Sequence, residues 1–243
     1  MNKTTRALAA VIFVPAAVAA LVGVLSGPHV QQLGVKRITD MLGFVVFFVA
    51  FAGMLAAPWW PIKGLKERSR FEKLETTSMI WLFMTLIPKV TWEFGWLFFH
   101  KQIIADKGHT WSGIWWSYMD GGDSRYLNID PGLLSLETAS VMFGFIGLIT
   151  LWHWCRSGKT SIACIYIFLL IMSSDFWGFY FYLMTEVYAG FPSVATPADM
   201  LIKFALTNSY WTIMPWVFAV WAMQKLRHLH VANARFESAR QLH

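Results

Sequence analysis

The sequence predicts an all-α integral membrane protein with six transmembrane helices and both termini in the cytosol. Hydrophobic residues make up 56% of the chain, charged residues only 14%, and the mean hydropathy is +0.48. That composition does not fit a soluble core of this size. Six apolar runs have the length of about 20 residues that crosses a hydrocarbon core of about 30 Å. They cover residues 7–26, 40–60, 77–99, 133–154, 162–186 and 204–224.

The distribution of basic residues sets the orientation. The formal net charge is +6, but the basic residues stand between apolar runs, so membrane topology explains them and we expect no nucleic-acid partner. With the N-terminus inside, thirteen of the 20 lysines and arginines fall in inner segments. The outer segments hold only Lys36, Arg37, Lys101, Lys107, Arg125 and Lys203.

The first run, 7–26, follows Lys3 and Arg6 and could be a secretory signal. Its apolar part is longer than a usual signal core, so we expect a retained helix. The chain then divides into an additional N-terminal helix and loop (1–38), a transmembrane domain (39–225) and a basic cytosolic tail (226–243).

The loop over 101–132 is rich in aromatic residues. Trp111, Trp115, Trp116 and Tyr118 predict an interfacial segment with its rings at headgroup level, and a lid over a substrate is the alternative. The cysteines, Cys155 and Cys164, match no metal-ligand or disulfide spacing, and we expect them to be packing residues.

Five ionisable residues lie inside the predicted spans, where a charge costs several kcal/mol unless it faces a partner or a cavity. They are Lys89, Glu93, Glu137, Asp175 and Glu186. The alternating helix directions place Glu93 and Glu137 together in the outer third of the membrane, where we expect a functional role. Lys89 and Asp175 sit deeper and could form a structural ion pair, whereas Glu186 is close enough to the interface to be solvated.

Helical spacing places further residues beside these charges, because residues three or four apart share a helix face. Lys89 lies on the face of Glu93, and Asn208 on that of Trp211, although Asn208 could bridge helices and Trp211 could simply pack. Two further stripes are Asp175, Phe179, Tyr182 and Glu186, and Glu137, Ser140, Val141 and Gly144. We therefore predict a pocket with an acidic ceiling and aromatic walls.

Such a pocket suits general acid–base chemistry on an alkene. Burial favours the neutral form of a carboxyl group, so one glutamate can protonate a double bond while a second group removes a proton from a neighbouring carbon. Aromatic faces such as Trp92, Trp211 or Tyr182 could stabilise the intermediate carbocation. No metal or other cofactor is expected, and the lipid substrate would enter from the bilayer.

The chain resembles the emopamil-binding protein family, the EXPERA-domain sterol double-bond isomerases. The similar residues run from Gly122-Asp123-Ser124-Arg125-Tyr126 through Asp130 to Leu136-Glu137-Thr138, then Tyr182-Leu183-Met184-Thr185-Glu186, Asn208, Trp211 and Pro215. The resemblance covers about 40–225 and implies a five-helix core around a lipid-facing cavity, with an added first helix. It also implies the endoplasmic reticulum as the location in a eukaryote.

Carried onto this chain, the resemblance makes Glu137 and Glu93 the catalytic carboxyls and Asn208 and Trp211 the supports of the cation. Lys89 stands where the sterol isomerases have a histidine, and it is a poor proton shuttle near neutral pH. Phe179 stands where they have an aspartate, with Asp175 one turn deeper.

The leading hypothesis is an intramembrane isomerase that shifts a carbon–carbon double bond in a sterol or terpenoid. We expect the substrate to contact Lys89, Trp92, Asp175, Phe179, Tyr182 and Glu186. Cyclisation of a terpenoid by the same groups and non-catalytic sterol or lipid binding are the alternatives, and the tryptophan-rich outer surface could support a homodimer.

Overall fold

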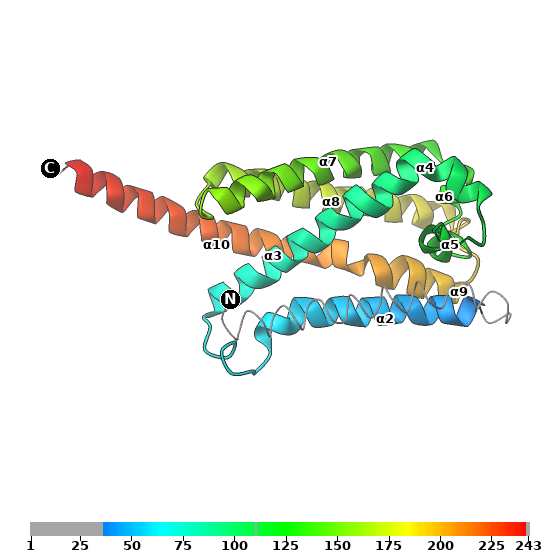
Figure 1. Cartoon of the computed structure of the whole chain (residues 1–243), viewed down its shortest axis with the longest axis horizontal. Coiled ribbons are helices and arrows are strands. Elements are labelled where there is room, and N and C mark those ends of the chain that lie inside the picture. The colour runs from blue at the N-terminus through cyan, green and yellow to red at the C-terminus, as the bar shows by residue number, and fades with distance from the viewer. Residues whose placement is uncertain (1–35, 110, 242–243) are drawn as a thin grey trace.

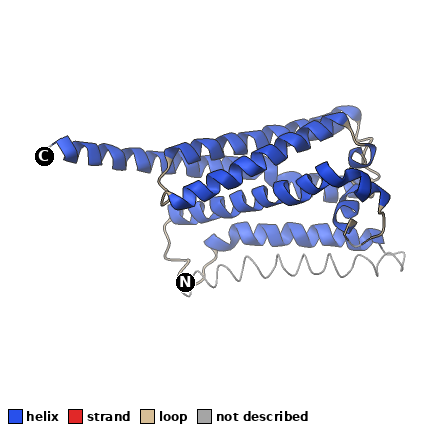
Figure 2. Ribbon diagram, turned by 45° about the horizontal axis from the view of Figure 1, so that its top comes forward, coloured by secondary structure: helices blue, strands red, loops and turns tan. Residues whose placement is uncertain are grey.

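The computed structural model describes residues 36–109 and 111–241, and within these ranges every regular element is a helix (Figures 1 and 2). An all-α fold was predicted and is confirmed there. The predicted first span at 7–26, and with it nearly all of the N-terminal unit, lies outside the described residues.

Long helices run side by side along one axis, and the short helices α5, α6 and α9 gather at one end (Figure 1). The long elements are α2 (Lys36–Ala56), α3 (Arg70–Pro88), α4 (Phe94–Ala105), α7 (Pro131–Arg156), α8 (Ile162–Ala189) and α10 (Thr207–Gln241). The short ones are η1 (Ala57–Trp59), η2 (Lys89–Glu93), α5 (Gly113–Met119), α6 (Arg125–Asn128), α9 (Pro197–Asp199) and η3 (Met200–Leu206). The five apolar runs predicted between 40 and 224 fall in these helical segments except for Trp60, and among the described helices α7 and α8 have the length and hydropathy of a membrane span.

Local sequence signals set the helix ends. The Ser69 side chain accepts from the backbone of Glu72 and the Glu72 carboxylate accepts from the backbone of Ser69, which makes a capping box at the start of α3. Asp130 caps α7 by accepting from the Leu133 amide at 2.8 Å. Gly190, with a positive φ of 78°, ends α8.

A π-helical segment joins α3 to α4. It begins directly after Pro88, which has no amide hydrogen to donate to the preceding turn. Lys89 and Glu93 are its first and last residues. Because a single π turn inserts a residue into the helix, it changes the faces on which later side chains lie, and such insertions are frequent at functional sites.

Small residues on α7 let the π segment approach closely. A Cβ added to Gly144 would lie 2.7 Å from Cβ of Lys89, and one added to Gly147 would lie 2.2 Å from a methyl carbon of Leu86. The sequence predicted a small face below Glu137 on this helix, and the structure confirms it.

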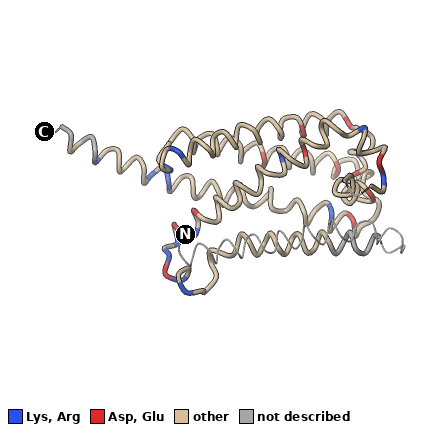
Figure 3. Tube along the Cα trace, in the orientation of Figure 1, with Lys and Arg blue, Asp and Glu red and all other residues tan. Residues whose placement is uncertain are grey.

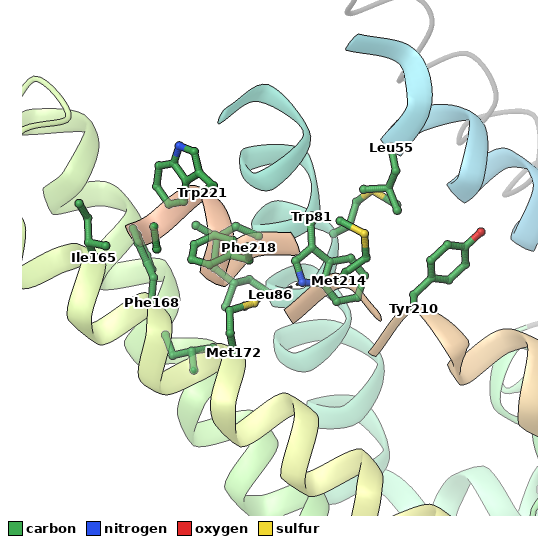
Figure 4. Close-up of a cluster of buried hydrophobic side chains, with 14 of the residues drawn as sticks. Leu55, Trp81, Leu86, Ile165, Phe168, Met172, Tyr210, Met214, Phe218 and Trp221 are labelled. Atoms are coloured by element: carbon green, nitrogen blue, oxygen red, sulfur yellow. Dashed lines mark hydrogen bonds between the residues drawn. The ribbon is translucent and has the colours of Figure 1, made fainter. Parts of the chain in front are cut away.

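The larger hydrophobic core is formed by side chains of α2, α3, α7, α8 and α10, several of which are shown packed together in Figure 4. Its centre is formed by large side chains that are completely buried, including Trp81, Phe168, Phe218 and Trp221. A second core, built around Trp96, Met119 and Tyr126, fills the end that carries α5 and α6.

The outer surface of the helices is apolar. The helices α7 and α8 are long and apolar enough to cross a membrane, yet only 28% and 33% of their most apolar stretches are buried inside the protein. Trp152, Trp177 and Trp216 are more than half exposed. Charged residues gather at the two ends, with a small group inside the bundle (Figure 3). A core helix of a soluble protein would be mostly buried, so this surface favours contact with lipid.

Candidate active site

The centre of the bundle holds an ion pair. Lys89 Nζ lies 2.9 Å from Asp175 Oδ1, and both side chains are almost completely buried. The second carboxylate oxygen of Asp175 accepts a hydrogen bond from the hydroxyl of Thr85 at 3.0 Å. The predicted pair between these two residues is confirmed, and its members come from η2 and α8.

Ser140 links this pair to Glu93. Lys89 Nζ donates to Ser140 Oγ at 2.5 Å, and the Ser140 hydroxyl in turn hydrogen bonds with the Glu93 carboxylate. One oxygen of Glu93, Oε2, is buried and has no hydrogen-bond partner within the described part of the chain. Ser140 was expected on this face as a small residue, and its hydroxyl is what connects the two helices.

Glu137 completes what we call the carboxyl cluster, namely Lys89, Glu93, Glu137 and Asp175. Its Oε1 accepts a hydrogen bond from the hydroxyl of Tyr126, while its Oε2 is buried without a partner among the described residues. Glu137 also interacts electrostatically with Glu93, a group of like charge, and with Lys89, a group of opposite charge. The cluster thus sets a single lysine against three carboxyl groups.

The carboxyl cluster lies between the two hydrophobic cores. Along the continuous helix from α3 to α4, Leu86 belongs to the first core and Trp96 to the second, with Lys89 and Glu93 between them. On α8, Asp175 likewise separates Met172 from Tyr182. The polar groups are therefore enclosed by apolar side chains on both sides along the bundle.

Aromatic rings surround the Tyr126–Glu137 contact. The ring of Tyr126 packs nearly edge-on against Trp96, Trp92 and Tyr118, with centroid distances of 4.9, 5.4 and 5.7 Å. The prediction that Trp92 lies near the acids agrees with this arrangement. Tyr126 was singled out only as part of a motif, and its place beside Glu137 was missed.

A second polar group, the tyrosine network, ties the loop to α8 and α10. Tyr118 and Tyr182 share a hydrogen bond between their hydroxyls at 2.6 Å, and Tyr182 donates to Asp123 Oδ2 at 2.6 Å. Asp123 also accepts hydrogen bonds from the backbone amide, Nε and Nη2 of Arg125. The network consists of Tyr118, Tyr182, Asp123, Arg125, Glu186 and Asn208.

Burial and charge fix the protonation states of Tyr118 and Arg125 in this network. Burial and the nearby charge of Asp123 raise the pKa of the Tyr118 hydroxyl well above its ordinary value. Burial disfavours the charge of Arg125, but the hydrogen bond and charge of Asp123 outweigh it and raise the pKa of the guanidinium. Tyr118 therefore stays a phenol and Arg125 a cation.

Glu186 is not solvated, contrary to one expectation from its place near the helix end. It is 2% exposed, and Arg125 Nε lies 3.2 Å from its Oε1. Asp123 is fully buried, and its contacts with Arg125, which also reaches Glu186, order the loop. The single arginine thus contacts two carboxyl groups, one from the loop and one near the C-terminal end of α8.

Asn208 and Trp211 make their contacts outside the carboxyl cluster. Asn208 Nδ2 donates to the Phe204 carbonyl at 2.7 Å and to Tyr118 Oη at 3.4 Å, so it joins the tyrosine network. Trp211 packs edge-on against Trp81 at 5.5 Å beside the first core. Phe179 packs against Tyr182 in the second core.

The aromatic loop turns its rings inward rather than toward headgroups. Trp116 is buried and donates to the Ile103 carbonyl at 2.7 Å, and Trp115 donates to the Trp92 carbonyl at 2.9 Å. Only Trp111 keeps the exposure of an interfacial ring. The interfacial-belt interpretation therefore holds for that residue alone, because the indole N–H groups of the others find backbone partners in the bundle.

Two hollows open on the surface of the described residues. One of about 550 Å³ runs along α8 between Tyr180 and Ala189, and one of about 290 Å³ lies beside Asp120 and Ser193. Neither is lined by Glu93 or Glu137. These two hollows are therefore not the predicted pocket around the acids.

No protein-family model matches this chain, and no curated protein sequence matches it either. The family resemblance therefore depends on the motif residues themselves, and the site has to be judged from its geometry.

Proposed function

We propose that this protein is an intramembrane acid–base isomerase that moves a carbon–carbon double bond within a sterol or terpenoid lipid. The observation that carries the proposal is the pair of electrostatically coupled glutamates, Glu93 and Glu137, each with one buried carboxylate oxygen lacking a partner among the described residues. A buried polar atom without a partner is costly. Use of this oxygen to give or take a proton in a reaction is a functional reason for leaving it without a partner.

The reaction needs one acid and one base. One glutamate donates its proton to an alkene carbon, and the π electron pair forms the new C–H bond, which leaves a carbocation on the neighbouring carbon. The second glutamate then removes a proton from the far side of that cation, and the C–H electrons become the shifted double bond. The lipid gains one proton and loses another, so its composition is unchanged.

The positive charge of Lys89 influences the ionisation of Glu93 and Glu137. Its ammonium group faces Asp175 directly and is electrostatically coupled to both glutamates. With Asp175 ionised, the lysine charge is matched, and any further negative charge on the glutamates is uncompensated. In the reactive state one glutamate is protonated and the other is ionised, so the cluster carries one uncompensated negative charge, which the cationic intermediate then offsets.

The membrane topology belongs to this proposal. The exposed apolar surfaces of α7 and α8 support spanning helices, and we propose that α2, the α3–α4 helix and α10 span as well, with a sixth helix at 7–26 and both termini in the cytosol. A substrate then reaches the carboxyl cluster from the hydrocarbon phase, without crossing water.

The test is turnover of candidate sterols and terpenoids by purified protein in deuterated water. Deuterium at an allylic carbon of a shifted alkene is the expected product. Glu137→Gln and Glu93→Gln should each abolish it, because an amide can neither donate nor accept the proton. Glu75→Gln is the matched control, since Glu75 pairs with Lys225 at the other end of the bundle.

Other outcomes would contradict the proposal. A ring-closed product from the unmodified protein that both glutamine variants fail to form would identify a terpenoid cyclase. Tight lipid binding with no deuterium uptake from any lipid offered would identify a non-catalytic lipid-binding protein, and full activity of Glu137→Gln would remove this glutamate from the mechanism.

A further inference from the structure

The carboxyl group of Glu137 has two oxygens in different surroundings. Oε1 accepts the hydroxyl proton of Tyr126, whereas Oε2 is buried and has no partner in the described parts of the chain. A phenol that donates to one oxygen leaves that oxygen poor at holding a proton of its own. The remaining site for a transferable proton is Oε2.

Tyr126 is held firmly in this position. Its ring is 5% exposed and lies among Trp92, Trp96 and Tyr118. Its backbone belongs to the short helix α6, whose first turn is tied to Asp123 through the Arg125 amide at 3.0 Å. These contacts therefore hold the hydroxyl against Glu137 and away from solvent.

The direction of this hydrogen bond is also determined. Burial and the charge of Glu137 raise the pKa of Tyr126 well above its ordinary value, so the phenol keeps its proton. The other titratable groups that act on Glu137 are Glu93 and Lys89 from η2 and Asp123 from the loop. Tyr126 alone donates a hydrogen bond to this carboxyl group among the contacts of the described residues.

We infer that Tyr126 is a positioning residue for the acid–base reaction: its hydroxyl occupies Oε1 of Glu137 and so directs the exchangeable proton to Oε2. This inference depends on the proposed function for its catalytic consequence, but the hydrogen bond itself can be tested without any substrate. It also gives the 122–126 motif a second task beyond ordering the loop, since Asp123 and Arg125 fix the helix that carries Tyr126.

The test is infrared spectroscopy of the Glu137 carbonyl together with kinetics. The Glu137 band is the carboxylic-acid C=O band that Glu137→Gln removes, recorded at the pH where it is strongest. In Tyr126→Phe we expect it to move to higher wavenumber, because the C=O loses its donor. We expect kcat to fall about 10- to 100-fold, the range for loss of one hydrogen bond to the carboxylate that forms when Glu137 gives up its proton, with KM within about twofold.

Tyr210→Phe is the matched control. Tyr210 is also a buried tyrosine whose hydroxyl makes a hydrogen bond, at 2.7 Å to the Phe48 carbonyl, but it lies in the other core. This variant should leave both the band and kcat unchanged. Should Tyr126→Phe fail to fold, wild-type protein labelled with 3-fluorotyrosine replaces it: the more acidic phenol should move the band to lower wavenumber.

The outcomes separate the two proposals. An unmoved Glu137 band in Tyr126→Phe, or in the labelled protein, overturns the positioning role whatever the activity. A moved band with unchanged kcat leaves the hydrogen bond but overturns its catalytic role. A moved band in a protein that turns over no lipid refutes the proposed isomerase while the assignment of the proton to Oε2 stands.

Discussion

Lys89 Nζ lies 2.9 Å from Asp175 Oδ1 and is the one cation that the described contacts place among the three carboxyl groups of the cluster. Loss of the lysine would leave three carboxyl groups together. Loss of the aspartate would leave the lysine with Glu93 and Glu137 as alternative counter-charges. The two members of the pair are therefore unequal in their effect on the fold.

Lys89→Met should lower the free energy of unfolding by about 3–5 kcal/mol, the cost of breaking a buried ion pair. Asp175→Asn should cost less, because the two glutamates can still neutralise Lys89. Thermal unfolding in detergent measures both values. The control is the more exposed pair Lys225–Glu75, where Glu75→Gln should cost about 0–1 kcal/mol; a larger cost for Asp175→Asn than for Lys89→Met would contradict this account.

Gly144→Ala should destabilise the protein by about 1–3 kcal/mol and reduce any turnover. The new methyl group would meet Cβ of Lys89 at 2.7 Å, and this atom cannot move without its backbone. Gly178→Ala on α8 is the control, because no atom lies within 4 Å of its added Cβ and alanine favours a helix. Equal melting temperatures for the two variants would show that the close approach of η2 to α7 is not required.

Arg125→Lys should lower the free energy of unfolding by about 1.5–3 kcal/mol despite the conserved charge. A lysine cannot reproduce the donation to Asp123 through Nε and Nη2 together with the contact to Glu186. Proteolysis of the loop over 101–132 is the second measurement, and we expect faster cleavage. An unaltered cleavage rate would mean that other contacts order the loop.

Cys155 provides a test of the proposed orientation. It is exposed at the end of α7 next to Arg156, whereas Cys164 is buried. In sealed vesicles or cells, a membrane-impermeant thiol reagent should label the native protein only from the cytosolic side, and Cys155→Ser should remove the label. Labelling from the outside would invert the topology.

Brominated lipids should quench tryptophans according to their exposure. Trp152, Trp177 and Trp216 are 58%, 51% and 62% exposed on the bundle surface, while Trp154 and Trp221 are fully buried. Single replacement of an exposed tryptophan by phenylalanine should lower the quenched fraction of the fluorescence. Replacement of a buried one should raise it, and the opposite pattern would contradict a lipid-facing surface.

The sequence was informative about elements and charges. Apolar runs of membrane length located five of the six predicted spans within observed helices, because burial in lipid or core requires continuous apolar segments with internal hydrogen bonds. The pairing of Lys89 with Asp175 followed from similar depth and opposite charge. The small face of α7 followed from the spacing of Ser140 and Gly144.

Other features could not be deduced from spacing. The π segment changed which faces Lys89 and Glu93 present, and Ser140 rather than a shared helical stripe brings them together. The rings of Trp115 and Trp116 turned inward because their N–H groups reach carbonyls on α4 and η2, which no periodicity within the loop encodes. Likewise, no spacing within α8 predicts that Glu186 pairs with Arg125 of the loop instead of being solvated.

By itself the sequence determined that the chain forms apolar helices and that Glu93 and Glu137 are placed among them, since hydropathy and charge are properties of single residues and short runs. Only the tertiary structure decided that Tyr126 occupies one oxygen of Glu137 while the other stays without a partner in the described chain. Which oxygen of Glu137 is occupied depends on contacts between a loop and a helix, and such contacts are set by packing in three dimensions.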